Sequence, residues 1–148
     1  MPVLYVWVPV LFLRVERELI VPSGETMQRE KTILVVEDDP SLRHLYWQAL
    51  TFEGFHVITA EDGETALDCM RHQAPALVVL DLNVPRVSGW GIHREMMANH
   101  ETRQIPVVVV TGTDPADVAA QAASILLKPV PVHQLVEEIH RHLNGRAA

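Results

Sequence analysis

The sequence contains a single cysteine, Cys69, among its 148 residues. One cysteine excludes an internal disulfide, and no cysteine and histidine residues have the spacing of a zinc site. A reducing, cytoplasmic setting is therefore expected. Basic residues are also few, since 12 lysine and arginine residues against 19 aspartate and glutamate residues give a formal net charge of −7. This balance argues against a protein held on nucleic acid by charge alone, because such domains present a basic face.

The sequence also lacks an apolar segment long enough to form a membrane span. Residues 1–13 read MPVLYVWVPVLFL, but a spanning helix needs about 20 such residues, and Pro2 and Pro9 interrupt the run. The basic start and small-residue cleavage site of a signal peptide are missing too. We therefore interpret residues 1–30 as an N-terminal extension, or place the natural start at Met27. A membrane-surface or partner-binding segment is the alternative.

What the sequence does contain is a regular alternation of strand-like and helix-like segments after residue 30. The composition, 48% hydrophobic and 21% charged residues, is that of one globular domain, expected over residues 31–145. Short apolar runs predict strands at 32–36, 55–59, 76–80, 105–110 and 124–127. Helices are predicted to begin at Asp39-Pro40, at Asp62-Gly63, near Trp90, as a short helix at Asp114-Pro115, and at Val132. The alternation indicates a parallel sheet covered by helices on both faces.

Polar residues stand where four of the apolar strands end. Glu37-Asp38, Asp81, Thr111 and Lys128 occupy these positions, and the carboxyl ends of parallel strands meet at one edge of the sheet. Clustered carboxylates repel one another unless a cation joins them, and oxygen ligands of this kind suit Mg²⁺. A carboxylate can also act as a nucleophile and form an aspartyl phosphate, whose oxygens then need a positive charge and a hydroxyl.

Four ordered segments, VVEDDP, VVLDLNVPRVSGW, VVVVTGT and LLKPV, resemble the receiver domain of two-component response regulators over about residues 31–145. The resemblance implies a flavodoxin-like (βα)5 fold, a doubly wound parallel sheet of order 2-1-3-4-5. It implies that Asp81 accepts a phosphoryl group from a sensor histidine kinase or a histidine phosphotransfer protein. The output would be contact with a separate, unknown protein, or onward phosphotransfer. The chain would then be no enzyme beyond its own phosphorylation and autodephosphorylation.

The same resemblance assigns a metal site to four positions. Asp38 matches a direct Mg²⁺ ligand, and Glu37 matches an acid that acts through water. Asp81 would bind the metal as well as the phosphoryl group. Asn83 matches the position whose backbone carbonyl completes the site. Asp39, by contrast, is interpreted as a helix cap, because Asp before Pro is a strong helix start.

Three further positions match the part of the family site that contacts the phosphoryl group. Thr111 matches the switch hydroxyl, Lys128 matches the site lysine, and Gly112 matches the small residue that admits the phosphodonor. The Lys128-Pro129 peptide bond is expected to be cis, as in the family.

Two departures from the family put the output step in doubt. An aromatic residue often stands three positions before the site lysine, where this sequence has Ile125. The segment between Thr111 and Lys128 is also short, which predicts a fourth helix of about two turns. These departures leave open a binding module independent of phosphorylation, and a phosphatase with an aspartyl nucleophile is a second alternative. The phosphatase usually needs an acid where this sequence has Asn83.

Overall fold

The computed structural model describes residues 31–145, so the predictions for residues 1–30 lie outside the described part of the chain. The elements are β1 (Thr32–Val36), α2 (Pro40–Phe52), β2 (His56–Ala60), α3 (Gly63–His72), β3 (Leu77–Leu80), α4 (Gly89–Ala98), β4 (Val107–Thr111), β5 (Ser124–Leu127) and α5 (Val132–Asn144). Among the helices in this range, none is long and apolar enough to cross a membrane.

The five strands form one parallel sheet of order β2-β1-β3-β4-β5, as predicted. In the register, Val36 of β1 lies opposite Leu80 of β3. Leu80 in turn lies opposite Val109 of β4, and Thr111 of β4 lies opposite Leu127 of β5. The residues that follow β1, β3 and β5 therefore emerge at the same edge of the sheet.

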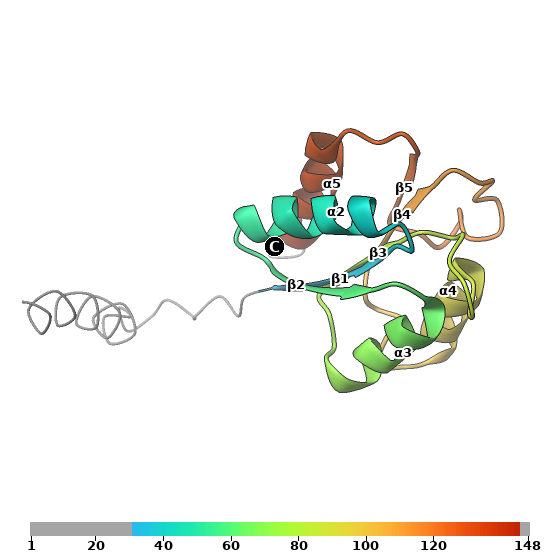
Figure 1. Cartoon of the computed structure of the whole chain (residues 1–148). Helices are drawn as coiled ribbons and strands as arrows, with labels where there is room; N and C mark the ends of the chain where they lie inside the picture. Colours follow the sequence, from blue (N-terminus) through green and yellow to red (C-terminus); the bar gives the residue numbers. More distant parts are fainter. Residues whose placement is uncertain (1–30, 146–148) are drawn as a thin grey trace, which may run out of the picture.

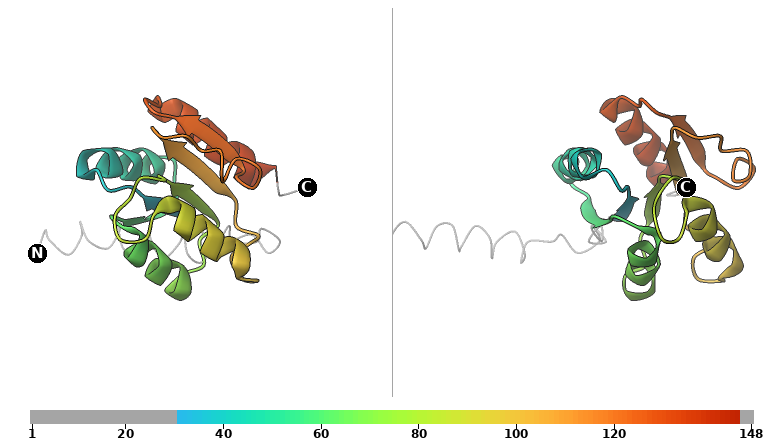
Figure 2. Two further views of the ribbon diagram at one scale, coloured as in Figure 1. Left: turned by 90° about the vertical axis from the view of Figure 1, so that its right-hand side faces the viewer. Right: turned by 45° about the vertical axis from the view of Figure 1, so that its right-hand side comes forward.

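Helices cover both faces of the sheet, with α2 and α5 on one face and α3 and α4 on the other (Figures 1 and 2). Successive strand residues point to opposite faces, so each buried strand contributes to two separate cores. The core under α2 and α5 contains Ile33, Val35, Tyr46, Leu50, Leu77, Val79, Val108, Val110, Leu135 and Ile139. The core over α3 and α4 contains Leu34, Val36, Ala66, Val78, Leu80, Ile92, Met96, Val107, Val109 and Val118. Burial on both faces explains why the strands are continuously apolar.

Short polar residues fix the starts of three helices. The Asp39 side chain caps α2 by accepting a hydrogen bond of 2.9 Å from the Leu42 amide, which confirms its interpretation as a cap. Asp62 caps α3 in the same way, and Ser88 caps α4. At the other end of α2, Gly54 takes a positive φ of 90°, a conformation that glycine adopts readily.

The prediction of a short helix between β4 and β5 was wrong, because residues 112–123 form bends and turns instead. The Val118 amide bonds to the Pro115 carbonyl, and the amides of Gln121 and Ala122 both bond to the Val118 carbonyl. Val118 is buried, while most of its neighbours in the segment are exposed. A helix this short is marginal without a wider apolar face to pack. The four regular helices are therefore those that flank the sheet.

Candidate functional site

The structure brings three of the predicted acidic residues together at the carboxyl edge of the sheet. Glu37, Asp38 and Asp81 each place one carboxylate oxygen within 4.8 Å of the others. Glu37 and Asp38 follow β1, and Asp81 follows β3, its neighbour in the sheet. A backbone hydrogen bond of 3.0 Å from the Asp81 amide to the Val36 carbonyl continues the pairing of the two strands. The pairing of β1 with β3 therefore sets the spacing of these acids.

Lys128 joins two of these acids from the far side of the site. Its Nζ lies 2.7 Å from Oε2 of Glu37 and 2.9 Å from Oδ2 of Asp81. Burial by itself lowers the pKa of Lys128, but the hydrogen bonds to Glu37 and Asp81 outweigh it and raise the pKa to about 12. The ammonium is thus held in its charged form beside Asp81.

Glu37 is almost fully buried, with 2% of its surface exposed. Burial raises its pKa above the ordinary value, although hydrogen bonds from the Lys128 side chain and the Asp39 amide act in the opposite direction. Those two bonds engage both carboxylate oxygens, since Oε1 accepts from the Asp39 amide at 3.1 Å and Oε2 from Lys128. Both carboxylate oxygens of Glu37 are thus engaged within the protein.

The donor set fits Mg²⁺ on its own chemistry. Three carboxylates face one ammonium, so two negative charges stay uncompensated at the edge of the sheet. All the acidic donors are oxygens, which hard divalent cations prefer. Asp38 is exposed while Asp81 is buried, so the site combines a fixed ligand with an open side. Mg²⁺ keeps several waters when it binds a protein, and an open side provides room for them.

The loop after β3 fixes the carboxylate of Asp81. Its Oδ1 accepts a hydrogen bond of 3.0 Å from the Asn83 amide, while Oδ2 accepts from Lys128. The start of α4 packs against the same loop, because the Gly89 amide donates to the Leu82 carbonyl at 3.0 Å. A Cβ on Gly89 would lie 2.5 Å from the Asp81 carbonyl oxygen. Glycine is required there for this close approach.

Thr111 is completely buried at the end of β4. Its hydroxyl lies 3.0 Å from the Thr113 hydroxyl and accepts a hydrogen bond of 3.2 Å from the Thr113 amide. A Cβ added to Gly112 would have no heavy atom within 4 Å, so the position is open as expected. The Lys128-Pro129 bond is cis, which confirms that prediction. Ile125, at the position that is often aromatic, is partly buried against the core over α3 and α4.

Sequence reasoning missed two arginines that hold the loops of the site. Arg43 donates from Nη1 to the backbone carbonyls of Glu37 at 2.9 Å and of Asp38 at 3.2 Å. Arg86 pairs with Glu64 and with Asp62 on the neighbouring loop. Arg86 lies 22 positions from Glu64 in the chain, so no local pattern marks that contact. Arg43 is only five and six positions from its two carbonyl partners, but the sequence does not show which way its side chain turns. The only local signal is Pro85 before Arg86, which predicts a turn.

The backbone of Arg86 is itself unusual. It has a φ of 68°, and it is the one non-glycine residue with positive φ among residues 31–145. This conformation costs about 1–2 kcal/mol for a residue with a side chain.

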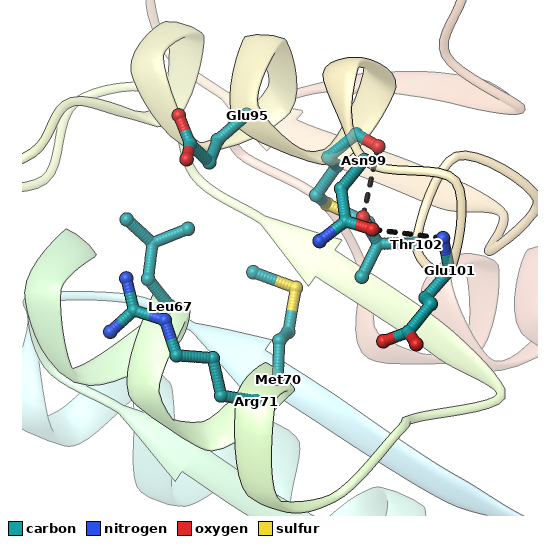
Figure 3. Close-up of a pocket in the computed structure, with 8 residues that line it drawn as sticks. Leu67, Met70, Arg71, Glu95, Asn99, Glu101 and Thr102 are labelled. Atoms are coloured by element: carbon teal, nitrogen blue, oxygen red, sulfur yellow. Dashed lines mark hydrogen bonds between the residues drawn. The ribbon is translucent and has the colours of Figure 1, made fainter.

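A separate pocket lies at the opposite edge of the sheet, between the last turns of α3 and α4 (Figure 3). Its volume is about 170 Å³, and its lining includes Leu67, Met70 and Arg71 of α3 with Glu95 and Met96 of α4. None of the predicted site residues lines it. The chemistry at the strand ends is therefore independent of this pocket.

A family model described as the response regulator receiver domain matches residues 33–140. Among curated proteins, the chain is similar to the "Probable transcriptional regulator ycf27" of Porphyridium aerugineum, with 39% identity over 85 residues. That match covers 57% of this chain and 34% of the relative. The chain thus spans about a third of the length of such relatives.

Solved structures with the same fold include the signal receiver domain of a signal transduction histidine kinase from Syntrophus aciditrophicus. It has a TM-score of 0.71 and 27% identity, and the match covers 78% of this chain and 91% of that one. The receiver domain of sensor histidine kinase PA1611 from Pseudomonas aeruginosa PAO1 has a TM-score of 0.71 and 24% identity, covering 77% of this chain and 98% of that one. That protein has a magnesium ion coordinated in its active site cleft.

Proposed function

The chain belongs to the response regulator receiver domain family, and we propose that its receiver domain is a phosphoacceptor that takes a phosphoryl group on Asp81. The observation that carries this proposal is the position of Lys128, whose ammonium bridges Asp81 and Glu37 beside a third acid. The donor is a sensor histidine kinase or a histidine phosphotransfer protein. The family supplies this partner class, and two solved structures with this fold are receiver domains of histidine kinases.

In the proposed reaction, a carboxylate oxygen of Asp81 attacks the phosphorus of the phosphohistidine. A bond forms between that oxygen and phosphorus, and the phosphorus–nitrogen bond breaks with its electron pair going to the imidazole, which then takes a proton from solvent. Lys128, held charged by its two carboxylate partners, stabilises the negative charge on the phosphoryl oxygens. The Thr111 hydroxyl, now bonded to Thr113, supplies a further donor to a phosphoryl oxygen.

A Mg²⁺ ion would be held by Asp38, by Asp81 and by the backbone carbonyl of Asn83, with Glu37 acting through water. When bound, it supplies positive charge that offsets the excess of carboxylates and the charge of the phosphoryl group. Magnesium coordinated in the cleft of a protein with the same fold supports this assignment.

We infer that the phosphorylated chain signals by contact with a separate protein or passes the phosphoryl group on, in the cytoplasm. The net charge of −7 and the single cysteine favour this over binding to nucleic acid or export. The turns between β4 and β5, together with Ile125, make the output surface differ from one built on a regular helix. A phosphorylation-independent binding module is therefore the alternative, and it predicts that partner binding is indifferent to the state of Asp81.

Intact-mass measurement after incubation with Mg²⁺ and acetyl phosphate tests the proposal. The wild-type chain is expected to gain one phosphoryl group, and Asp81→Asn is expected to gain none. Asp117→Asn, which changes an exposed acid in the turns after β4, serves as the matched control and should react like wild type. Uptake that survives in Asp81→Asn would contradict the assignment. Continuous turnover of a phosphate ester such as p-nitrophenyl phosphate would instead favour the phosphatase alternative.

A further inference from the structure

The loop between β2 and α3 touches both halves of the candidate site. Glu61, Asp62 and Glu64 of this loop and the first turn of α3 each face an arginine. On one side, Glu61 lies 3.8 Å from Arg43, the residue that binds the backbone carbonyls of the acidic pair after β1. On the other side, Asp62 and Glu64 contact Arg86, which lies in the loop that carries Asp81 and Asn83.

The contact with Arg86 is the tighter of the two. Nη1 of Arg86 lies 2.8 Å from Oε2 of Glu64, and Nε lies 3.4 Å from Oδ2 of Asp62. Asp62 is 5% exposed and is fixed in place, because its other oxygen accepts a hydrogen bond of 2.8 Å from the Thr65 amide. Arg86 therefore contacts one buried acid that is fixed at the start of α3, Asp62, and one exposed acid, Glu64.

The backbones of the two loops are also in direct contact, and they lie side by side where α3 begins (Figure 1). The Gly63 amide donates a hydrogen bond of 3.1 Å to the Pro85 carbonyl. A Cβ on Gly63 would lie 1.8 Å from the Val87 carbonyl oxygen. Residues 85–87 thus pack against Gly63, the first residue of α3, and the ion pairs of the Arg86 side chain add to this contact.

The conformation of Arg86 indicates that this contact has a role. An arginine with φ of 68° is strained, and glycine would relieve the strain at no steric cost. Strain of this kind persists where the surrounding structure uses it, commonly beside a functional site. Here the strained residue lies three positions after Asn83 and directs its guanidinium away from the site, onto α3.

We propose that Arg86 is a positioning residue: by pairing with Asp62 and Glu64, it holds the Asp81–Asn83 loop in its metal-binding geometry. The longer contact between Arg43 and Glu61 makes a weaker contribution of the same kind to the loop after β1. The proposal rests on the proposed function, because it concerns the site that would bind Mg²⁺. It makes the start of α3 energetically coupled to occupancy of the site. By linkage, Mg²⁺ binding must then also protect the start of α3.

Calorimetric titration of the full chain with Mg²⁺ provides the test. Arg86→Ala is expected to weaken Mg²⁺ affinity about threefold to tenfold at low salt, at or below the lower end of effects reported for outer-shell groups. The difference from wild type should shrink at high salt, because exposed ion pairs are screened. Arg71→Ala is the matched control: Arg71 forms an exposed pair of 2.7 Å with Asp68 on the same helix, away from the site, and its loss should leave Mg²⁺ affinity unchanged.

Arg86→Gly separates positioning from stability. Glycine relieves the positive φ, so this variant should resist urea at least as well as Arg86→Ala, yet it should lose Mg²⁺ affinity to the same extent. Arg86→Lys keeps the charge without the two-point contact and should recover part of the loss. If wild type binds Mg²⁺ and Arg86→Gly binds it equally well, the positioning role is wrong while the proposed function stands.

Hydrogen exchange gives a second readout of the same coupling. In wild type, Mg²⁺ should slow exchange of the amides at residues 63–66 as well as those at residues 82–84, 86 and 87, and in Arg86→Ala only the second group should respond. Wild-type chain that fails to bind Mg²⁺ overturns the proposed metal site and the positioning role together, which distinguishes that result from a failure of Arg86 alone.

Discussion

Lys128 donates a hydrogen bond of 2.9 Å to Oδ2 of Asp81, although the two residues are 47 positions apart in the chain. The same ammonium lies 2.7 Å from Glu37, so one cation serves two buried acids. Replacing it alters the charge at the site without changing a metal ligand.

The first prediction concerns Lys128→Met. Loss of the ammonium leaves three carboxylates without a counter-charge, so Mg²⁺ affinity should rise while phosphorylation by acetyl phosphate slows about a hundredfold, as when a single oxyanion donor is removed. Stability in Mg²⁺-free buffer should fall by about 2 kcal/mol, less than for a fully buried pair because Lys128 is partly exposed. Calorimetry, intact mass and urea denaturation measure the three effects. Lys31→Met, whose Nζ bonds to the Leu143 carbonyl, is the control and should leave affinity and rate unchanged.

The second prediction separates two neighbouring acids after β1. Asp38→Asn should weaken Mg²⁺ binding at least about tenfold without loss of stability in Mg²⁺-free buffer, because it removes one of three repelling carboxylates. Asp39→Asn should leave Mg²⁺ affinity and stability near wild type, since asparagine caps helices about as well as aspartate. Calorimetric titration and urea denaturation measure both variants. Equal losses of Mg²⁺ affinity in the two variants would show that general acidity, and not a ligand position, determines binding.

The third prediction tests the close approach at the start of α4. A Cβ at Gly89 would lie 2.4 Å from Cα of Leu82 and 2.5 Å from the carbonyl oxygen of Asp81. Both are backbone atoms, so Gly89→Ala should lower the free energy of unfolding by about 3 kcal/mol, at the high end for overpacking. Gly112→Ala has open space around it and should change it by less than about 0.5 kcal/mol. Chemical denaturation compares the two, and a stable Gly89→Ala would contradict the observed packing.

The predicted bounds of strands and helices agree with the structure where neighbouring residues alone determine where an element begins and ends. β1 and β5 have the predicted bounds, because their apolar runs end in charged or proline-flanked residues. β2 and β4 begin one and two residues later than predicted, since apolar residues continue into the loops before them. The short helix after Asp114-Pro115 failed because a capping signal alone does not stabilise a helix that packs through a single buried residue, Val118.

For the site, the sequence pattern predicted which residues stand at strand ends, but it did not predict their hydrogen-bond and ion-pair partners. The convergence of Glu37, Asp38 and Asp81 follows from a parallel sheet in which β1 and β3 are neighbours. The hydrogen bond of Thr111 to Thr113 and the contacts of Arg86 depend on the path of loops, which local periodicity does not encode. These loop contacts are the ones that orient the predicted residues.

The last prediction concerns His93, which is buried in α4 with 2% of its surface exposed. Among the described residues, its Nε2 has no hydrogen-bond partner, and burial lowers its pKa below the ordinary value of 6.5. The unfolded chain therefore binds a proton at this position before the folded chain does. Stability should be fully present above pH 6.5 and decline as the pH falls below it, with a slope of at most about 1.4 kcal/mol per pH unit for this one proton.

Urea denaturation between pH 7.5 and pH 5.5 measures this dependence. In His93→Leu, the free energy of unfolding should decline less as the pH falls, because leucine has no titratable group. The stability of the variant relative to wild type should therefore increase as the pH falls. His100→Leu changes an exposed histidine and should keep the wild-type slope. If His93→Leu and wild type lose stability in parallel, other groups must be responsible for the acid sensitivity, and the imidazole of His93 must find a partner that keeps it charged inside the fold.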